Sequence, residues 1–165
     1  MLKPIRRVVT GHDENGKAVV VSDGPAPNVV TSEHRPGGRT NIWRTTSMPA
    51  CYGGDRDEAA EDVKFTLEPV SGGTNFRISE YPPESESDRV DSAKAFGEVG
   101  AAHKLVDGAR HPFMHSTDTV DYAIVLEGEI TMLLDDEATK FSGDYHWCQL
   151  QTGYNNLYLT MTAFF

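Results

Sequence analysis

The strongest constraint on the fold is a strict alternation over residues 120–127, VDYAIVLE. Large apolar residues (Val, Tyr, Ile, Leu) alternate with Asp, Ala, Val and Glu. A period of two places successive side chains on opposite faces of a β-strand. Gly128 interrupts the pattern, residues 130–134 resume it, and a turn at Asp135-Asp136 precedes another apolar run at 138–141. This part of the chain is therefore predicted to form antiparallel strands joined by tight turns.

The rest of the chain also divides into short β segments. Its 15 Gly and 9 Pro favour many short segments over long helices. Two β-branched runs, 6–10 and 17–22, flank GHDENG and predict a hairpin. The other predicted elements are strands at 39–46 and 74–81, an exposed loop at 49–62 with a solvated acidic run, a helix at 85–102 with Ser87 as N-cap, and two strands in the C-terminal tail. About eight or more strands predict an all-β domain, a sandwich or small barrel.

Charge and composition exclude several classes of partner. The formal net charge of −10 would repel phosphate backbones and anionic membranes, so neither nucleic acid nor a membrane is an expected partner. The two cysteines, Cys51 and Cys148, form no CxxC motif and predict neither a disulfide framework nor a structural zinc site. The start MLKPIRRVVTG lacks the apolar region of a secretory signal, and no apolar run is long enough to span a bilayer. A cytoplasmic protein is predicted.

One stretch, HPFMHSTDTVDYAIVLEGEI at 111–130, carries chemistry as well as structure. The run HSTDTVDYAIVLEGEITMLLDDE, with SGD after it, resembles the cupin superfamily, in particular small bacterial and fungal cupins with the motif HxTxTxDYxxVLxGE…LDDGE…GD. RRVVTGHDENGKAVVVSDGPAPN is similar to the opening of the same proteins. The resemblance covers roughly residues 4–48 and 103–144. It implies one cupin domain over 1–165: N-terminal strands at 1–48, a loop at 49–62, one short helix, and a double-stranded β-helix core, a jelly-roll-like barrel, at 103–165.

The resemblance also implies metal ligands. The first cupin motif is G(x)5HxH(x)3–4E(x)6G, in which two His and the Glu bind a divalent metal. On it, His115 matches the first His, Asp121 the Glu and Gly128 the final Gly, whereas Thr117 stands at the second His. The implied ion is Fe²⁺, Mn²⁺, Ni²⁺ or Zn²⁺, because imidazole and carboxylate suit all four.

His111 is a further candidate ligand, because it has the same strand parity as His115. It lies six residues before Thr117, roughly 20 Å along an extended chain, so it could contribute only if Pro112 bends the chain. The cavity is expected to be lined by Thr117, Thr119, Ala123 and Val125.

The second cupin motif, QRGTNHxW, is not matched. After Gly143-Asp144 the sequence reads YHWCQLQTGYNNLYL, where Asn156 takes the place of the His only if three residues are inserted. His146 is another candidate ligand in this stretch. The chain is also shorter after the motif than the resemblance implies, so an altered C-terminal end, from an unspliced or frame-shifted reading or a divergent form, is an expectation.

For function, the resemblance implies a small-molecule enzyme: a metal-dependent oxidoreductase or dioxygenase acting on an aromatic or polyketide-like metabolite, as in fungal secondary metabolism. His115 and Asp121 are the expected catalytic residues. Without metal, His115 would act as a general acid/base hydrogen-bonded to Asp121 or Thr119. The alternatives are a non-catalytic, metal-free binding or accessory cupin and a truncated, inactive form. A homodimer is expected, with the runs 6–10 and 17–22 exchanged between copies because pairing removes exposed edge strands.

Overall fold

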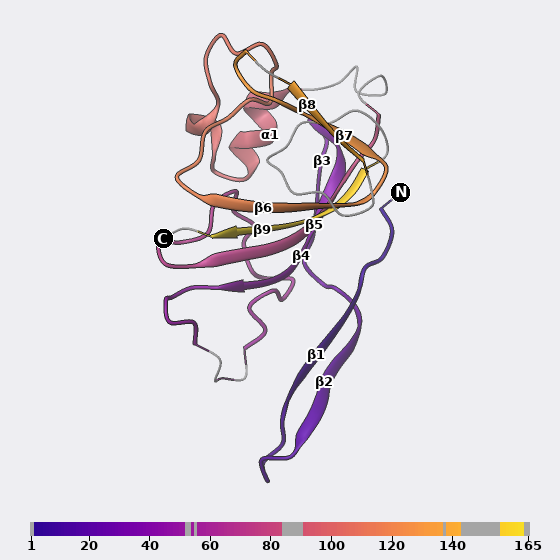
Figure 1. The fold of residues 1–165 in the computed structure, drawn as a ribbon. Coiled ribbons are helices and arrows are strands. Elements are labelled where there is room, and N and C mark those ends of the chain that lie inside the picture. The colour runs from indigo at the N-terminus through magenta and orange to yellow at the C-terminus, as the bar shows by residue number, and fades with distance from the viewer. Residues whose placement is uncertain are drawn as a thin grey trace.

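The computed structural model describes residues 2–51, 54, 56–83, 91–136, 138–142 and 156–163. Within them the chain forms nine strands, one α-helix and one 3-10 turn (Figure 1). They are β1 (Arg6–His12), β2 (Ala18–Pro25), β3 (Val29–Ser32), β4 (Arg35–Thr45), β5 (Thr74–Tyr81), α1 (Ser92–Glu98), η2 (Ala102–Lys104), β6 (Val120–Glu127), β7 (Glu129–Leu133), β8 (Ala138–Ser142) and β9 (Asn156–Ala163).

The main sheet has five strands in the order β3-β4-β5-β9-β6, and every neighbouring pair is antiparallel. Two further two-stranded sheets, β1-β2 and β7-β8, complete the strand pairing of the described residues. The predicted all-β class is confirmed. The closed double-stranded β-helix stays a prediction, because the pairing of the described strands gives one open sheet and two hairpins.

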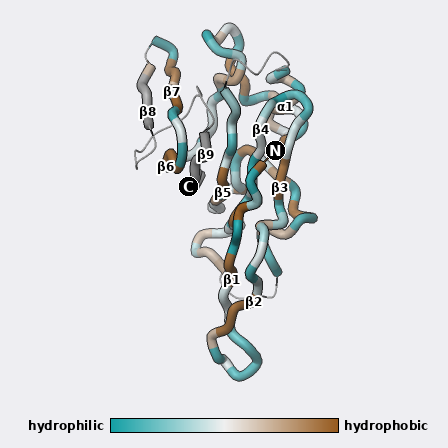
Figure 2. Tube along the Cα trace, turned by 90° about the vertical axis from the view of Figure 1, so that its right-hand side faces the viewer, coloured by the Kyte–Doolittle hydropathy of each residue, from teal (hydrophilic) through white to brown (hydrophobic). Residues whose placement is uncertain are grey.

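The predicted N-terminal hairpin is confirmed, and it is longer than the β-branched runs. Asp13 makes its turn, because its carboxylate Oδ1 accepts from the backbone N–H of Asn15 and of Lys17, both at 2.9 Å. Gly16 follows with φ +75°, which glycine adopts without strain. Figure 1 shows the hairpin extending away from the main sheet, and Figure 2 shows apolar stretches along it.

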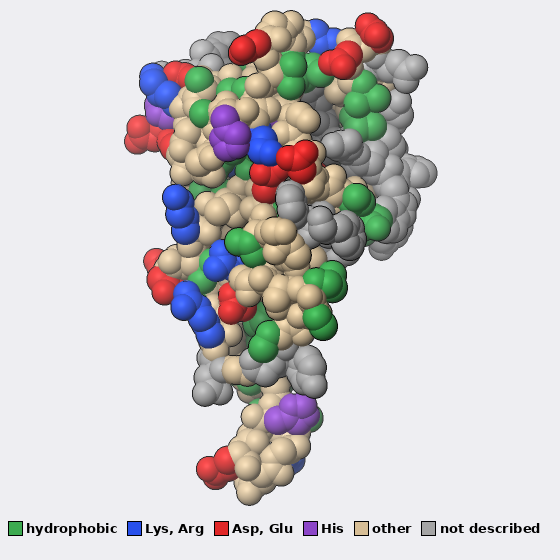
Figure 3. Space-filling view, turned by 90° about the vertical axis from the view of Figure 1, so that its left-hand side faces the viewer, with side chains coloured by type: hydrophobic (Ala, Val, Ile, Leu, Met, Phe, Trp, Pro, Cys, Tyr) green, Lys and Arg blue, Asp and Glu red, His purple; other side chains and the backbone are tan. Residues whose placement is uncertain are grey.

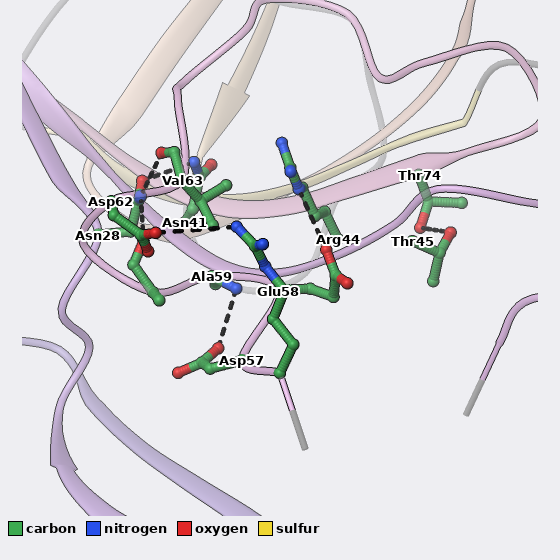
Figure 4. A network of polar contacts seen from close by, with 12 residues as sticks. Asn28, Asn41, Arg44, Thr45, Asp57, Glu58, Ala59, Asp62, Val63 and Thr74 are labelled. Carbon is green, nitrogen blue, oxygen red and sulfur yellow. Dashed lines mark hydrogen bonds and ion pairs between the residues drawn. The ribbon is translucent and has the colours of Figure 1, made fainter. Parts of the chain in front are cut away.

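The predicted exposed loop at 49–62 is exposed over most of its described residues, but its 57–60 segment is partly buried. Its described residues form no strand or helix, but Ala59 is fully buried. Asn28, at 3% exposure, donates through Nδ2 to the carbonyls of Ala60 (2.7 Å) and Val63 (2.8 Å), and accepts at Oδ1 from Asn41 (2.8 Å). Figure 4 shows this network. The 57–60 segment is held against the sheet because the Ala60 carbonyl accepts from the buried amide of Asn28.

The other elements differ from the predictions mainly at their ends. Strand β3 was not predicted, and β4 begins at Arg35, four residues before the predicted strand at 39–46. Helix α1 is shorter than the predicted 85–102. Its N-cap is Asp91, which accepts from the Lys94 N–H at 3.0 Å, and Ser87 lies outside the described residues. Of the two strands predicted in the tail, the described part contains β9, which pairs between β5 and β6.

Two apolar clusters hold these elements together. One joins α1 to the loops through Phe65, Phe96, Val99 and Ala101. The other consists of Val125 and the fully buried Ile130, with Tyr81 packed against them. Phe96 of helix α1 and Ile130 of strand β7 therefore each bury a side chain in one of these clusters. Among the described residues, no helix is long and apolar enough to cross a membrane.

Candidate functional site

The buried side of the main sheet is polar. On β5 the buried residues are Asn75, Arg77 and Ser79, at 3–5% exposure. Strand register continues this face onto β6, because Asp121 and Ala123 lie across β9 from Asn75 and Arg77. On β4 the same face continues to Asn41, opposite Arg77, and to Arg39, opposite Ser79. We call this the interior face: Arg39, Asn41, Asn75, Arg77, Ser79, Asp121, Ala123 and Val125.

The orientation of β6 places a predicted ligand on this face. Ala123 and Val125 are 2% and 3% exposed, whereas Val120 and Tyr122 are 47% and 38% exposed. The face with the larger apolar residues therefore points outward at this strand. Asp121 shares the parity of Ala123 and Val125, so the strand directs its carboxylate toward the interior face.

Two arginines dominate the chemistry of the interior face. Arg77 is 5% exposed, and its terminal Nη2 donates to the carbonyls of Thr66 (3.1 Å) and Leu67 (3.2 Å). Burial and, to a lesser extent, the neighbouring charge of Arg39 lower the pKa of Arg77 to about 10, although Tyr81 and Asp121 act in the opposite direction. Both the Arg77 and the Arg39 guanidinium lie over the ring of Phe65, with Cζ 4.7 and 5.5 Å from its centroid.

A third arginine lies between aromatic rings at the start of β4. Arg35 Cζ is 4.1 Å from the Tyr81 ring centroid and 4.8 Å from that of Phe113. Phe113 in turn stacks on Phe96 of α1, with centroids 6.2 Å apart. Phe113 belongs to the 111–130 motif, so these contacts connect the beginning of the motif to β4 and to the helix.

His115 is held by its own segment rather than by Asp121. Its Nδ1 lies 2.8 Å from the Phe113 carbonyl oxygen, and its ring meets Phe96 edge-on at 4.9 Å. A carbonyl only accepts, so Nδ1 carries a proton in this contact. The segment is fixed because the Ser116 N–H donates to the Lys104 carbonyl at 2.9 Å. His115 thus presents an available Nε2 on an exposed, well-supported backbone.

Asp121 ends a short chain of hydroxyl groups. Thr119 Oγ1 donates to Asp121 Oδ1 at 3.0 Å, and Thr117 Oγ1 lies 2.8 Å from Thr119 Oγ1. Because Thr119 has one hydroxyl proton and gives it to Asp121, Thr117 is the donor in the second bond. Thr117 therefore occupies the position expected for the second His. Its hydroxyl donates to Thr119, which in turn donates to the Asp121 carboxylate.

The described residues do not assemble a three-ligand metal site. No group of three or more His, Cys, Asp or Glu side chains among them is placed to hold a metal ion. His111 accepts from the Phe113 N–H at 3.2 Å through Nδ1, within its own turn. His115 satisfies one requirement of a ligand, since a backbone carbonyl orients its ring. His146 lies outside the described residues. A divalent metal held by three protein ligands would need at least one of them from beyond the described residues.

The arginines were missed by sequence reasoning for a specific cause. In TNFRISEY, at 74–81, the pattern predicts that the apolar Phe76 and Ile78 face inward, yet the alternate polar residues are the buried ones. No family model matches the chain, and no curated protein is similar enough to it to count as a match. The fold and the site together define an all-β domain whose main sheet has a charged interior face next to aromatic side chains.

Proposed function

We propose that this protein is a cytoplasmic, cupin-type enzyme that binds an aromatic or polyketide-like metabolite at the interior face. One observation carries the proposal: a small β domain buries Asn75, Arg77 and Ser79 on the same side of its main sheet. Burying polar groups costs free energy unless they serve as partners for something, and ligand sites combine apolar walls with a few such groups. Phe65 and Phe113 supply the aromatic part of those walls.

The residues of the 111–130 motif give the proposed site its acid–base chemistry. His115 offers Nε2 as the base, and its Nδ1–H is oriented by the Phe113 carbonyl. Asp121 holds a negative charge that accepts from Thr119. In the proposed role, His115 removes a proton from a hydroxyl group of the bound metabolite, and Asp121 with its hydroxyl chain orients the polar end of that molecule. Metal-dependent oxidation is the narrower form of the proposal.

A non-catalytic binding protein is the second candidate. Its support is that Thr117 takes part in the hydroxyl chain and that the described residues form no three-ligand group. The same interior face would then bind the metabolite without transforming it.

The test is to purify the untagged protein under native conditions and to analyse extracted small molecules and metal content together. A variant that fills the interior face, Ala123→Phe, is expected to lose any bound metabolite. Val120→Phe, on the outward face of the same strand, is the matched control and is expected to retain it. If neither the native protein nor the control carries or binds an aromatic metabolite, the proposal fails. A metal content far below one equivalent after repletion excludes the metal-dependent form. Turnover that is unchanged in His115→Gln excludes His115 as the base.

A further inference from the structure

We propose that Arg39 and Arg77 form a carboxylate-binding subsite, so that the ligand of the interior face is an aromatic acid. The inference deepens the proposed function and rests on it. Its starting point is charge: the whole chain carries a formal net charge of −10, yet two guanidinium groups converge on one ring on the buried side of the main sheet.

The positive charge of Arg77 is compensated only in part within the described residues, by the nearby charge of Asp121. None of them forms an ion pair with Arg77, and its Nε has no hydrogen-bond partner there. Its contacts to the Thr66 and Leu67 carbonyls satisfy Nη2 but bring no negative charge. Buried charges are normally paired, because removing an ion from water is expensive. An incoming carboxylate would supply both the acceptor and the charge.

Arg39 adds a second positive charge beside Arg77, and no ion pair among the described residues accounts for it there. Register places Arg39 opposite Ser79 and Arg77 opposite Asn41, so the two arginines are diagonal neighbours on one face of β4 and β5. Within the part of the chain that the structure describes, the Arg39 side chain forms no ion pair and no hydrogen bond; its guanidinium group lies over the Phe65 ring, and its charge acts on Arg77. Two like charges in this arrangement repel each other unless an anion lies between them.

A purely structural role explains less of the arrangement. Arg77 does fasten the Thr66–Leu67 backbone to the sheet, but this needs donors rather than a second arginine beside them. Asp121 is the acidic group that acts on Arg77, and it already accepts from Thr119. The charge of one carboxylate, which acts on Arg77, leaves the two guanidinium groups together with a net positive charge. Guanidinium groups bind carboxylates through parallel N–H donors, and the Phe65 ring beneath them suits an aromatic acid over an aliphatic one.

The experiment compares benzoate with its neutral isostere benzamide at constant ionic strength, by calorimetry and by thermal unfolding. The native protein is expected to bind benzoate at least about tenfold more tightly than benzamide, because the benzoate carboxylate would accept a charge-assisted hydrogen bond that the neutral amide cannot. Benzoate is also expected to raise the Tm in a concentration-dependent way. Chloride at the same ionic strength should produce no comparable increase.

Arg39→Gln is the decisive variant, because Arg77 is buried and its replacement risks misfolding. Arg39→Gln should lose the preference for benzoate, and without ligand it should unfold at a temperature no lower than the native protein, because a repulsion is removed. Arg39→Lys should retain part of the preference. Arg6→Gln, which removes an exposed arginine paired with Asp23 on the hairpin, is the matched control and should bind benzoate normally.

Equal binding of benzoate and benzamide, or a benzoate preference that survives in Arg39→Gln, overturns the carboxylate subsite. A neutral metabolite extracted from the native protein and lost in Ala123→Phe would also overturn it, while leaving the proposed function intact. Failure of both probes and absence of any extracted metabolite would remove the two proposals together.

Discussion

Gly37 shows how a single residue determines the path of β4. Its φ is +87°, and a Cβ atom at this position would lie 2.1 Å from the Glu80 carbonyl oxygen of β5. The backbone conformation and the close approach both require glycine. We expect Gly37→Ala to lower the free energy of unfolding by about 2 kcal/mol or more, because strain and a steric clash add. Urea unfolding followed by circular dichroism measures it.

The control for this variant lies in the helix. Gly97 of α1 is exposed, its φ is not positive, and nothing lies within 4 Å of the Cβ position. Gly97→Ala should therefore stabilise the protein by about 0.5–1 kcal/mol through helix propensity. Equal effects of the two substitutions would contradict the assigned geometry at Gly37.

The pair of Arg7 and Asp57 predicts a pH dependence. Arg7 is 6% exposed, its Nη1 donates to Asp57 Oδ1 at 2.9 Å, and this hydrogen bonding lowers the pKa of Asp57. Because the folded-state pKa lies below the unfolded one, the stabilisation is complete above about pH 4 and is lost as the pH falls through the folded-state value.

Asp57→Asn should therefore cost about 1–2 kcal/mol at pH 7, a value kept low because Asp57 is about one third exposed. The difference in midpoint urea concentration between the native protein and the variant should be smaller at pH 3 than at pH 7, because the carboxyl of the unfolded native chain is then largely protonated and part of the stabilisation is lost. A difference between them that is the same at pH 7 and pH 3 would show that the ion pair does not contribute. Glu14→Gln, at an exposed position in the hairpin turn, is the control and should show little change at either pH.

At the scale of elements, local pattern predicted strands well and long-range burial poorly. Strands β5 and β6 match the predicted ranges 74–81 and 120–127, because alternation and turn residues are local signals. Strand β3 was missed because Pro25 and Pro27 precede it and its four residues gain their pairing only from β4. Asp121 was singled out from motif spacing, and its role as a ligand or catalytic residue stays a prediction. Arg39 and Arg77 were missed because polar residues in an alternating strand predict the solvent face, and only strand pairing shows the reverse.

The loop after β4 depends on a partner remote in sequence, and this dependence can be measured. Asn28 donates to the Ala60 and Val63 carbonyls, so Asn28→Asp places a carboxylate oxygen where an amide donor stood. We expect a loss of about 3 kcal/mol and faster hydrogen exchange of backbone amides at 57–63, because buried acceptors then face each other. Asn15→Asp, in the exposed hairpin turn, is the matched control. Unchanged exchange in Asn28→Asp would exclude the amide as the anchor of the loop.

At the scale of the whole molecule, the hairpin β1-β2 is the part that the described fold leaves without a covering layer. Figures 1 and 3 show it as a narrow arm extending from one end of the body. Val20 and Val21 are neighbours in sequence and point to opposite faces, yet they are 59% and 64% exposed. A two-stranded ribbon exposed on both faces is marginally stable by itself. We propose that a second copy of the chain covers it, so that the protein is a homodimer with exchanged hairpins.

A dimer of this kind has to be driven by apolar contact, because two chains of net charge −10 repel each other. The double substitution Val20→Asp and Val21→Asp is expected to turn a dimer into a monomer in size-exclusion chromatography with light scattering. Substituting Val70, which is 54% exposed on the body, with Asp should leave the dimer intact. Added salt should strengthen association of the native protein by screening the repulsion. A native protein that is monomeric at all concentrations, or a dimer that persists in the double variant, would show that the hairpin is not the interface.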